Sequence, residues 1–369
     1  MTEVNDAKDC PVACGLLAFV VFGAFLSMGC RAAPVAARRS GPLHLGTNAV
    51  LYTVEDADLI ASLGSPGKVG ARVTFYWSDI EPTDGNWQFA VYDDLVKRAT
   101  DGNIPLLGVV AYAMKRVAAT ATSMQGDPWA LSFCPPDDIG QFATFAGMAA
   151  ARYPQVKYWE IWNEPNAAYF WRPSPEPARY TELLKSSYAA VKAANPNAVV
   201  VLGGLSPGVG SGQLNTTIAS SFLQSVYQNG GKNYFDAVGF HPYNGGAPPD
   251  SYLAGYVNSV HDVMAQNGDG NKPVWVTEIG WYVGTGGNAL SEAQQADYLS
   301  SAFTILYDLN FVQRAYWYNL KDYSNPATAV VPSPGTVCGP GVGTPVDYGL
   351  FQYSGSPRPA ADAFRKAVQ

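Results

Sequence analysis

The sequence predicts a single parallel (β/α)8 barrel of the TIM type, on three observations. After residue 40, eight short apolar runs rich in β-branched residues alternate with eight helix-like stretches. The runs lack polar alternation, as expected for parallel strands covered on both faces. About 330 residues suit an eight-stranded barrel with loop insertions. A doubly wound sheet is the alternative, disfavoured because no strand is followed by a glycine-rich phosphate loop that opens a helix.

The individual elements follow from this alternation in chain order. We expect strands at 43–47, 70–75, 104–112, 157–163, 198–203, 237–241, 274–278 and 315–319. We expect helices at 54–63, 89–101, 139–152, 177–195, 218–229, 249–266, 291–309 and 360–368. The glycine- and proline-rich stretch 324–345 follows the last strand, so it should form a long loop at the carboxyl ends of the strands, where this fold builds its active sites.

The first forty residues differ in composition from the rest. Residues 15–29 are almost purely apolar, a run that is short for a membrane span and typical of a signal peptide. Acidic residues outnumber Lys8 before this run, which leaves an uncleaved anchor or a misassigned start as alternatives. Cys30 lies in a loose match to a lipid-attachment motif. We expect 1–40 to be a signal peptide or anchor with a spacer, 41–369 to be one barrel domain, and the protein to be secreted or attached to the cell envelope.

Charge and cysteine content exclude several classes of function. The net charge is −7 and no basic cluster lies beyond residue 40, so nucleic acid, which is bound through contacts to phosphates, is not an expected partner. The cysteines and the three histidines show no metal-ligand spacing, and we expect neither a metal nor a cofactor. Cys134 and Cys338 remain beyond the first forty residues. Export favours a disulfide between them, and two unpaired thiols are the alternative.

Two glutamates close strands at matching positions in the expected barrel. Glu164 lies in the stretch 158–166 (YWEIWNEPN) that ends the fourth strand, and Glu278 ends the seventh. Proline or glycine follows each within two residues, so both carboxylates should face the barrel mouth. One glutamate at a strand end is most simply a surface or salt-bridged carboxylate. Two at matching positions, each in a tryptophan-rich strand, favour a reactive pair.

Hydrolysis of a glycosidic bond requires two such carboxyl groups. One protonates the leaving oxygen while the other attacks carbon or directs water. Strands four and seven lie on opposite sides of a closed barrel, so their tips can flank a bound sugar. A separation of about 5–5.5 Å lets the second group attack carbon directly, with retention of configuration. Repulsion between the two charges would keep Glu164 protonated while Glu278 is ionised.

These motifs resemble clan A of the glycoside hydrolases, with families 39 and 5 nearest. The resemblance rests on Trp162-Asn163-Glu164-Pro165 with Thr277-Glu278, and on segments 72–82 (RVTFYWSDIEP) and 85–87 (GNW). It spans about residues 43–320. The resemblance implies Glu164 as acid/base and Glu278 as nucleophile. It also implies a substrate-binding set of Asn163, Arg72, His241, Tyr243 and, as the platform under the sugar, Trp317.

Arg72 and His241 can also be judged by their own chemistry. Arg72 would lie inside the barrel, where an unpaired charge is costly, so it requires a carboxylate partner. Glu278 and Glu160 are the candidates, and a purely structural Arg72–Glu160 pair is the alternative to a role at the site. His241 and Tyr243 could both hydrogen-bond Glu278 or the substrate.

Aromatic residues near strand ends are candidates for stacking on sugar, because a flat ring presents an apolar face. We expect this of Trp317, then Trp171 and Trp281, and not of the other loop residues Trp77, Trp87 and Trp129. Trp159, Trp162 and Trp275 are expected in the core. His44 should lie at a strand entry and His261 on an exposed helix face. The acidic stretch 79–85 could suggest calcium, but a loop turning into a helix explains it equally well.

The sequence therefore predicts a retaining glycoside hydrolase acting on a β-linked polysaccharide or oligosaccharide, with a glycan as its partner. Family 39 exo-acting β-xylosidases usually carry a β-sandwich after the barrel, whereas here only one helix is expected after strand eight. That difference favours endo action. The alternatives are a transglycosylase using the same two glutamates and a catalytically idle carbohydrate-binding barrel.

Overall fold

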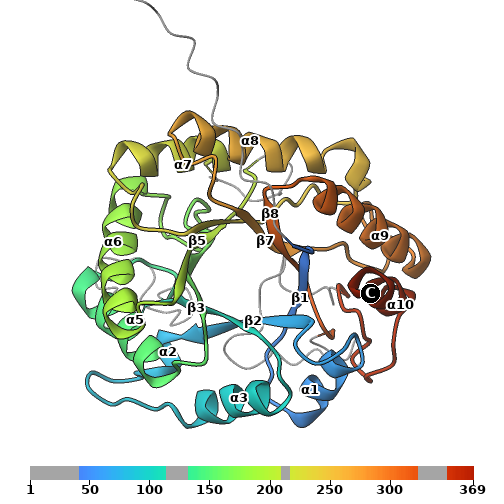
Figure 1. Ribbon diagram of the computed structural model, residues 1–369, viewed down its shortest axis with the longest axis horizontal. Coiled ribbons are helices and arrows are strands. Elements are labelled where there is room, and N and C mark those ends of the chain that lie inside the picture. The colour runs from blue at the N-terminus through green and yellow to red at the C-terminus, as the bar shows by residue number, and fades with distance from the viewer. Residues whose placement is uncertain (1–40, 114–131, 209–216, 323–346) are drawn as a thin grey trace, which may run out of the picture. The chain divides into compact units, whose positions relative to one another are not determined.

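A computed structural model describes residues 41–113, 132–208, 217–322 and 347–369. Eight parallel strands form a closed barrel in the order β1 to β8, and β8 pairs with β1. Figure 1 shows the strands at the centre with helices outside them. The strands are β1 (His44–Asn48), β2 (Val69–Tyr76), β3 (Leu106–Ala111), β4 (Tyr158–Asn163), β5 (Val199–Leu205), β6 (Ala237–Phe240), β7 (Val274–Ile279) and β8 (Val312–Trp317). The predicted (β/α)8 barrel is confirmed.

The helices lie close to their predicted positions. They are α1 (Val54–Ala61), α2 (Trp77–Ile80), α3 (Ala90–Asp101), α5 (Ile139–Arg152), α6 (Pro177–Ala194), α7 (Ala219–Gln228), α8 (Leu253–Gln266), α9 (Glu292–Asp308) and α10 (Pro359–Val368), with a 3-10 turn η2 (Pro249–Ser251). Capping boxes at Thr53 and Ser291 begin α1 and α9 by satisfying backbone N–H groups that a helix start leaves without partners.

Three elements differ from the sequence-based expectation. The short helix α2 was not expected, and the expected helix 249–266 is divided between η2 and α8 at Tyr252. Strand β8 begins at Val312, three residues earlier than predicted, and ends at Trp317.

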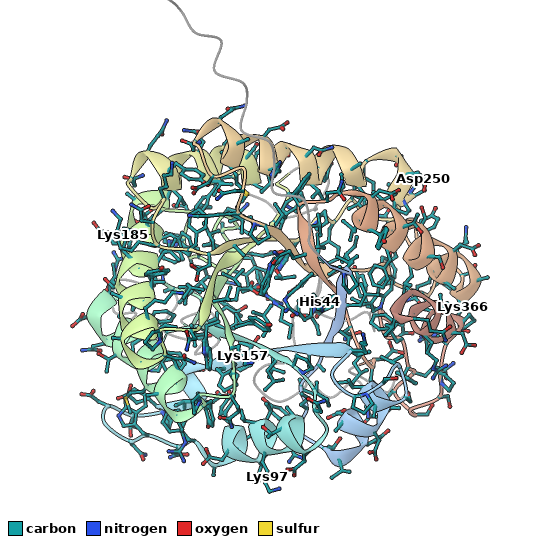
Figure 2. All side chains as sticks on the ribbon, viewed as in Figure 1. His44, Lys97, Lys157, Lys185, Asp250 and Lys366 are labelled. Atoms are coloured by element: carbon teal, nitrogen blue, oxygen red, sulfur yellow. The ribbon has the colours of Figure 1, made fainter. Side chains whose placement is uncertain are left out.

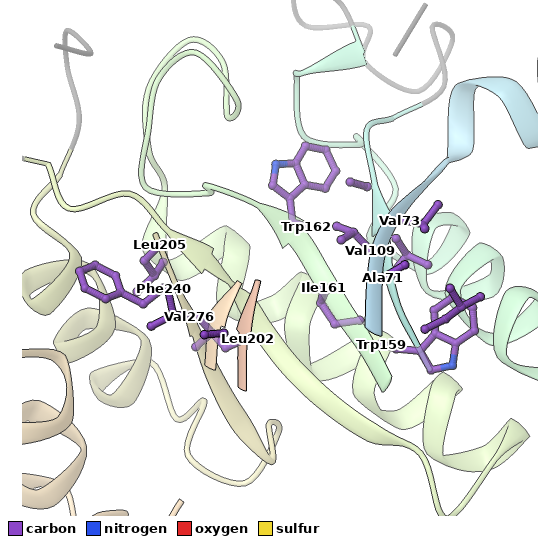
Figure 3. Packing of buried hydrophobic residues seen from close by; sticks show 14 of the residues in the cluster. Ala71, Val73, Val109, Trp159, Ile161, Trp162, Leu202, Leu205, Phe240 and Val276 are labelled. Atoms are coloured by element: carbon purple, nitrogen blue, oxygen red, sulfur yellow. The ribbon is translucent and has the colours of Figure 1, made fainter. Parts of the chain in front are cut away.

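Apolar side chains fill both sides of the barrel wall. Toward the helices, residues such as Ala71, Val73 and Ile161 belong to one large buried cluster (Figure 3). A second, smaller cluster joins Leu107, Val201, Ala237, Trp275 and Tyr316. By strand parity these five point inward, because Leu107 pairs in register with Arg72 and the remaining strands follow the same alternation.

Side chains occupy the space that the strands enclose (Figure 2), so the barrel is a packed core and not a pore. Polar groups gather above this inner cluster, at the carboxyl ends of the strands. Among the described helices, none is both long and apolar enough to span a bilayer.

Candidate active site

The two glutamates predicted from the strand ends lie close together around His241, which directly follows β6. Glu164 directly follows β4, and Glu278 is the fifth residue of β7. The Nδ1 atom of His241 lies 3.0 Å from Glu164 Oε1 and 3.8 Å from Glu278 Oε2. Because both distances share this nitrogen, those two oxygens are at most about 6.8 Å apart. The barrel therefore brings together two carboxyl groups that lie 114 positions apart in the chain.

Glu278 receives hydrogen bonds on both of its oxygens. Arg72 Nη1 donates to Oε1 at 2.6 Å, and the Tyr243 hydroxyl donates to Oε2 at 3.1 Å. Its side chain is 13% exposed, whereas that of Glu164 is 5% exposed. Two donors, one of them cationic, favour the ionised form of a carboxylate. Both oxygens of Glu278 are thus engaged by donors, while part of its side chain stays exposed.

His241 Nδ1 lies 3.8 Å from Glu278 Oε2, but the permanently charged partner of Glu278 among the described residues is Arg72, at 2.6 Å. It forms a bidentate pair with Glu160, with both N···O distances at 2.9 Å. Its remaining donors reach Glu278, Asn48 Oδ1 at 2.8 Å and Asn163 Oδ1 at 2.8 Å. The sequence left Glu160 and Glu278 as alternative partners, and the structure shows that Arg72 contacts both.

The charge of Arg72 is secure despite its burial. Burial by itself would lower the pKa of this guanidinium, but the carboxylates of Glu160 and Glu278 outweigh it and raise the pKa above its usual range. All five N–H groups have acceptors, which is what a buried guanidinium requires. Arg72 therefore joins a structural ion pair below the site to a carboxylate within it.

Asn163 is oriented by the same guanidinium. Its Oδ1 accepts from Arg72 Nη2, which leaves the amide NH2 as the donating end of the side chain. Asn163 immediately precedes Glu164 and is 5% exposed. This orientation suits the expected role of Asn163 as a donor to a sugar hydroxyl.

His241 connects the two strands that carry Glu164 and Glu278. Its Nδ1 contacts Glu164 Oε1 at 3.0 Å and its Nε2 contacts Thr277 Oγ1 at 3.0 Å. In a neutral ring that donates from Nδ1, Nε2 is the acceptor for the Thr277 hydroxyl. The ring is completely buried, so both contacts are shielded from water. Thr277 was used only as part of a family motif in the sequence, and the structure gives it a specific contact.

Two consecutive glycines in β5 make room for this arrangement. A Cβ on Gly204 would lie 2.0 Å from His241 Nε2 and 2.6 Å from Thr277 Oγ1. A Cβ on Gly203 would lie 2.5 Å from the Ile161 carbonyl and 2.6 Å from that of Trp162. The Gly-Gly pair at the end of a predicted strand was the available sequence signal, since glycine in a strand often marks a close approach.

The backbone is strained where it presents Glu164. Trp162 has φ of 70° and Glu164 has φ of 42°, both in the left-handed region that non-glycine residues avoid. Each such residue costs on the order of 1–3 kcal/mol and persists only where its surroundings enforce it. Here the Glu164 amide donates to the Gly204 carbonyl at 2.9 Å, and Trp162 Nε1 donates to the Phe170 carbonyl at 2.8 Å.

Trp317 does not lie where the sequence placed it. Tyr316 belongs to the inward-facing cluster, so the next residue of β8, Trp317, points outward, toward Phe303 of α9. The Trp317 ring is fully buried, and its Nε1 donates to the Tyr348 carbonyl at 3.0 Å. A ring without an accessible face cannot stack on a sugar, so the platform role expected for Trp317 is corrected.

Trp171 and Trp281 are buried as well. Trp171 packs edge-on against Trp162 and donates to Glu176, and Trp281 donates to the Ala247 carbonyl at 2.9 Å. Neither ring offers a face to substrate in this structure. The accessible ring of the loop after β4 is Tyr169, which is 40% exposed.

The remaining expectations divide between the described and the omitted segments. Trp159, Trp162 and Trp275 are buried as expected, whereas His261 is 7% exposed and stacks on Phe311, not on an exposed face. Within the described ranges no cluster of ligating side chains could hold a metal ion. In the acidic stretch 79–85, the Glu81 carboxylate accepts from Trp77 Nε1 and the Gly85 amide. Residues 1–40, Trp129 and Cys338 lie outside the described residues, and with them the signal peptide, the anchor at Cys30 and the disulfide to the buried Cys134.

Comparison with known proteins gives the family. The family model of the glycosyl hydrolase catalytic core matches residues 104–335, more than half of the chain. No curated protein sequence matches. Among solved structures, the chain is similar to a family 39 glycoside hydrolase from Bacteroides cellulosilyticus WH2, with a TM-score of 0.65 and 23% identity. That similarity covers 89% of this chain and 63% of the other, so this chain spans less than two thirds of the Bacteroides enzyme.

Two further structures have the same fold. A monomeric beta-xylosidase from Caulobacter crescentus CB15 has a TM-score of 0.62 and 18% identity, covering 89% of this chain and 69% of that one. The GH5_18 protein from Streptomyces cattleya in complex with GlcNAc has a TM-score of 0.60 and 15% identity, covering 90% and 80%. The family match confirms the resemblance that the motifs of the fourth and seventh strands predicted: the chain belongs to the glycosyl hydrolase catalytic core family.

Proposed function

We propose that this protein is a retaining glycoside hydrolase with Glu278 as its nucleophile and Glu164 as its acid/base. The observation that carries the proposal is the asymmetry of the two carboxyl groups around His241. Glu278 accepts hydrogen bonds from Arg72 and Tyr243, donors that suit a nucleophilic carboxylate, while Glu164 contacts the imidazole and is more deeply buried. The nucleophile must be an anion to attack the anomeric carbon, and the acid must carry a proton to give to the leaving oxygen.

The reaction has two steps. In the first, Glu164 gives its proton to the glycosidic oxygen while a carboxylate oxygen of Glu278 attacks the anomeric carbon. The bond from carbon to the leaving group breaks and a glycosyl–Glu278 ester forms. In the second, Glu164 takes a proton from water, the water oxygen attacks the same carbon, and Glu278 leaves as a carboxylate. The donors Arg72 and Tyr243 stabilise the returning charge.

The spacing of the carboxyl oxygens supports this mechanism over inversion. Inverting enzymes separate their carboxyl groups by about 6.5–9.5 Å to admit a water molecule, and retaining enzymes by about 5–5.5 Å. The contacts of His241 limit the distance from Glu164 Oε1 to Glu278 Oε2 to at most about 6.8 Å, which excludes most of the inverting range for this pair of oxygens. The β-xylosidase name of a similar structure supports a β-linked glycan as substrate. Endo action and export remain proposals that rest on the sequence.

The mechanism is tested by replacing each glutamate and following the anomeric product. Glu278→Gln should lower kcat by several powers of ten. Glu164→Ala should lose activity on glycans but retain more on aryl glycosides with good leaving groups, which need less protonation. The matched control is Glu182→Gln, an exposed carboxylate on α6, which should keep normal kcat. Near-normal turnover by Glu278→Gln, or an inverted first-formed product in NMR, would contradict the assignment.

A further inference from the structure

Four tyrosines form a group of ring contacts that reaches Glu278 through Tyr243, and the sequence singled out only Tyr243. The Tyr348 ring centroid lies 5.5 Å from that of Tyr318, 5.8 Å from Tyr282 and 6.5 Å from Tyr243. All four rings are partly exposed, unlike the three tryptophans expected to bind sugar. We call Tyr243, Tyr282, Tyr318 and Tyr348 the tyrosine cluster.

The tyrosine cluster is tied to the nucleophile side of the site. Tyr243 donates to Glu278 Oε2 at 3.1 Å, and Tyr348 is the next ring beyond Tyr243. Burial, then Tyr282 and the charge of Glu278, raise the pKa of Tyr348 to about 12. Its hydroxyl is therefore a neutral donor at any ordinary pH, and its ring presents apolar surface beside that donor.

The backbone around Tyr348 is fixed by residues of β8, of α9 and of the segment that follows β8. The Tyr348 carbonyl accepts from Trp317 Nε1 at 3.0 Å and from the buried Gln295 Nε2 at 3.4 Å. The next amide, of Gly349, donates to Asp322 Oδ1 at 2.8 Å. This accounts for the buried indole of Trp317: it holds the segment that carries Tyr348.

Hydrogen bonds and ion pairs of the residues around Tyr348 also hold its segment in place. The Val283 amide donates to the Asp347 carbonyl at 2.8 Å, and the Leu350 amide donates to the Asn319 carbonyl at 3.0 Å. Arg358, at the start of α10, pairs with Asp322 at 2.6 Å and with Glu292. The main chain on both sides of Tyr348 is thus bound to the barrel, while its ring is directed toward the other three tyrosines.

The charged groups around Glu278 indicate what kind of sugar the tyrosine cluster can accept. Among the described residues, the permanently charged partner of Glu278 is Arg72, whose five donors are all engaged by Glu160, Glu278, Asn48 and Asn163. A sugar carboxylate placed beside Glu278 would meet a like charge without a compensating cation from the described residues. Tyrosine faces and hydroxyls suit a neutral sugar, which has both C–H faces and hydroxyl groups.

We propose that Tyr348 is a substrate-contacting residue that binds a neutral sugar on the glycone side of the bond to be cleaved. The glycone side follows from the position of the tyrosine cluster at the nucleophile, because the nucleophile attacks the sugar that is transferred and the acid lies at the leaving group. The inference rests on the proposed retaining mechanism and adds a specificity residue to it.

The test compares Tyr348→Ala and Tyr348→Phe with the control Tyr353→Ala in the same C-terminal segment, where Tyr353 is 52% exposed. The substrate is the neutral 4-nitrophenyl β-glycoside that the unmodified enzyme cleaves fastest, together with its 2,4-dinitrophenyl analogue. Tyr348→Ala should raise KM about tenfold, as loss of one aromatic contact does. The increase in KM should be equal for the substrates with the two leaving groups. Tyr348→Phe should have a KM close to that of the unmodified enzyme, because it keeps the ring. The KM of Tyr353→Ala should stay within about twofold of the unmodified enzyme.

Three results would overturn the proposal. One is an unchanged KM in a folded Tyr348→Ala protein, with Tyr348→Leu used if the alanine variant does not fold. Another is a loss that depends on the leaving group, which would place Tyr348 at the acid side. The third is faster cleavage of a 4-nitrophenyl β-glucuronide than of any neutral glycoside. Failure of the mechanism itself is distinguishable, because Glu278→Gln would then retain turnover whatever Tyr348 does.

Discussion

At the scale of single residues, Arg72 has two roles that can be separated. With Glu160 it forms a buried bidentate pair, and with Glu278 it donates to the proposed nucleophile. The Glu160 carboxylate is completely buried and also accepts from the Gly204 amide at 2.8 Å. Removing the guanidinium would therefore leave the buried Glu160 carboxylate without its counter-charge, and it would remove the cationic hydrogen-bond donor of Glu278.

Arg72→Met should destabilise the fold by about 3–5 kcal/mol, because breaking one side of a buried pair leaves an uncompensated charge. Adding Glu160→Met should restore much of this stability, since an apolar pair of similar volume avoids the charge burial. Activity should remain low in both proteins, because Glu278 has lost its cationic donor. Urea unfolding and kcat/KM measure the two effects. Recovery of activity along with stability would mean that Arg72 serves only the structural pair.

At the scale of secondary-structure elements, the end of β5 determines how β4, β6 and β7 approach one another. Gly203 lets the carbonyls of Ile161 and Trp162 come close, and Gly204 lets His241 reach Thr277. The left-handed backbone at Trp162 and Glu164 adjoins these glycines. The geometry around Glu164 is therefore a property of three neighbouring strands and not of β4 alone.

Gly204→Ala should displace His241, because its Cβ would lie 2.0 Å from the ring nitrogen. We expect kcat to fall at least tenfold and stability to fall by about 1–3 kcal/mol, as overpacking of a tight core does. The matched control is Gly255→Ala on α8, where the added Cβ meets nothing within 4 Å. That control should keep full activity and gain up to about 1 kcal/mol, since alanine is the better helix former. Equal kcat values in the two variants would rule out tight packing at Gly204.

At the scale of the whole molecule, buried tyrosines make stability sensitive to alkali. Burial raises the pKa of Tyr316 and Tyr348 to about 12, and raises the pKa of Tyr180 and Tyr243 above the ordinary value of about 10. In the unfolded chain these hydroxyls ionise near their ordinary value. The folded state therefore binds more protons than the unfolded state above about pH 10.

The raised pKa values of these tyrosines make the folded state less stable as the pH rises above about 10. The contribution of these tyrosines is fully present below about pH 10 and is lost as the pH rises through their raised pKa values. The free energy of unfolding in urea should therefore decline steeply above about pH 10, and native tyrosinate absorbance should lag behind that of the unfolded chain. A free energy of unfolding that stays level to about pH 12 would show that the buried hydroxyls titrate normally.

The sequence alone was sufficient for the barrel and for the pair of glutamates. Both are encoded locally: eight apolar runs alternate with helix patterns, and Glu164 and Glu278 each sit at a strand end followed by a turn residue. The need of Arg72 for a carboxylate was also predictable, because a buried cation requires one. That both Glu160 and Glu278 meet this need depends on where β2, β4 and β7 lie around the barrel.

Only the tertiary structure decided which aromatic rings face the site. The role of Trp317 was misassigned because it came from the family resemblance, whereas Tyr316 is the residue of β8 that points inward, and one position along a strand reverses the face on which a side chain lies. Tyr348 carries no motif and lies more than thirty positions after Trp317, the last residue of β8, yet the Trp317 side chain and the backbone bonds of Asp347 and Leu350 hold it beside Tyr243, which contacts Glu278. Periodicity is a short-range property of the chain, whereas the direction of a ring is set by closure of the barrel and by contacts between distant segments.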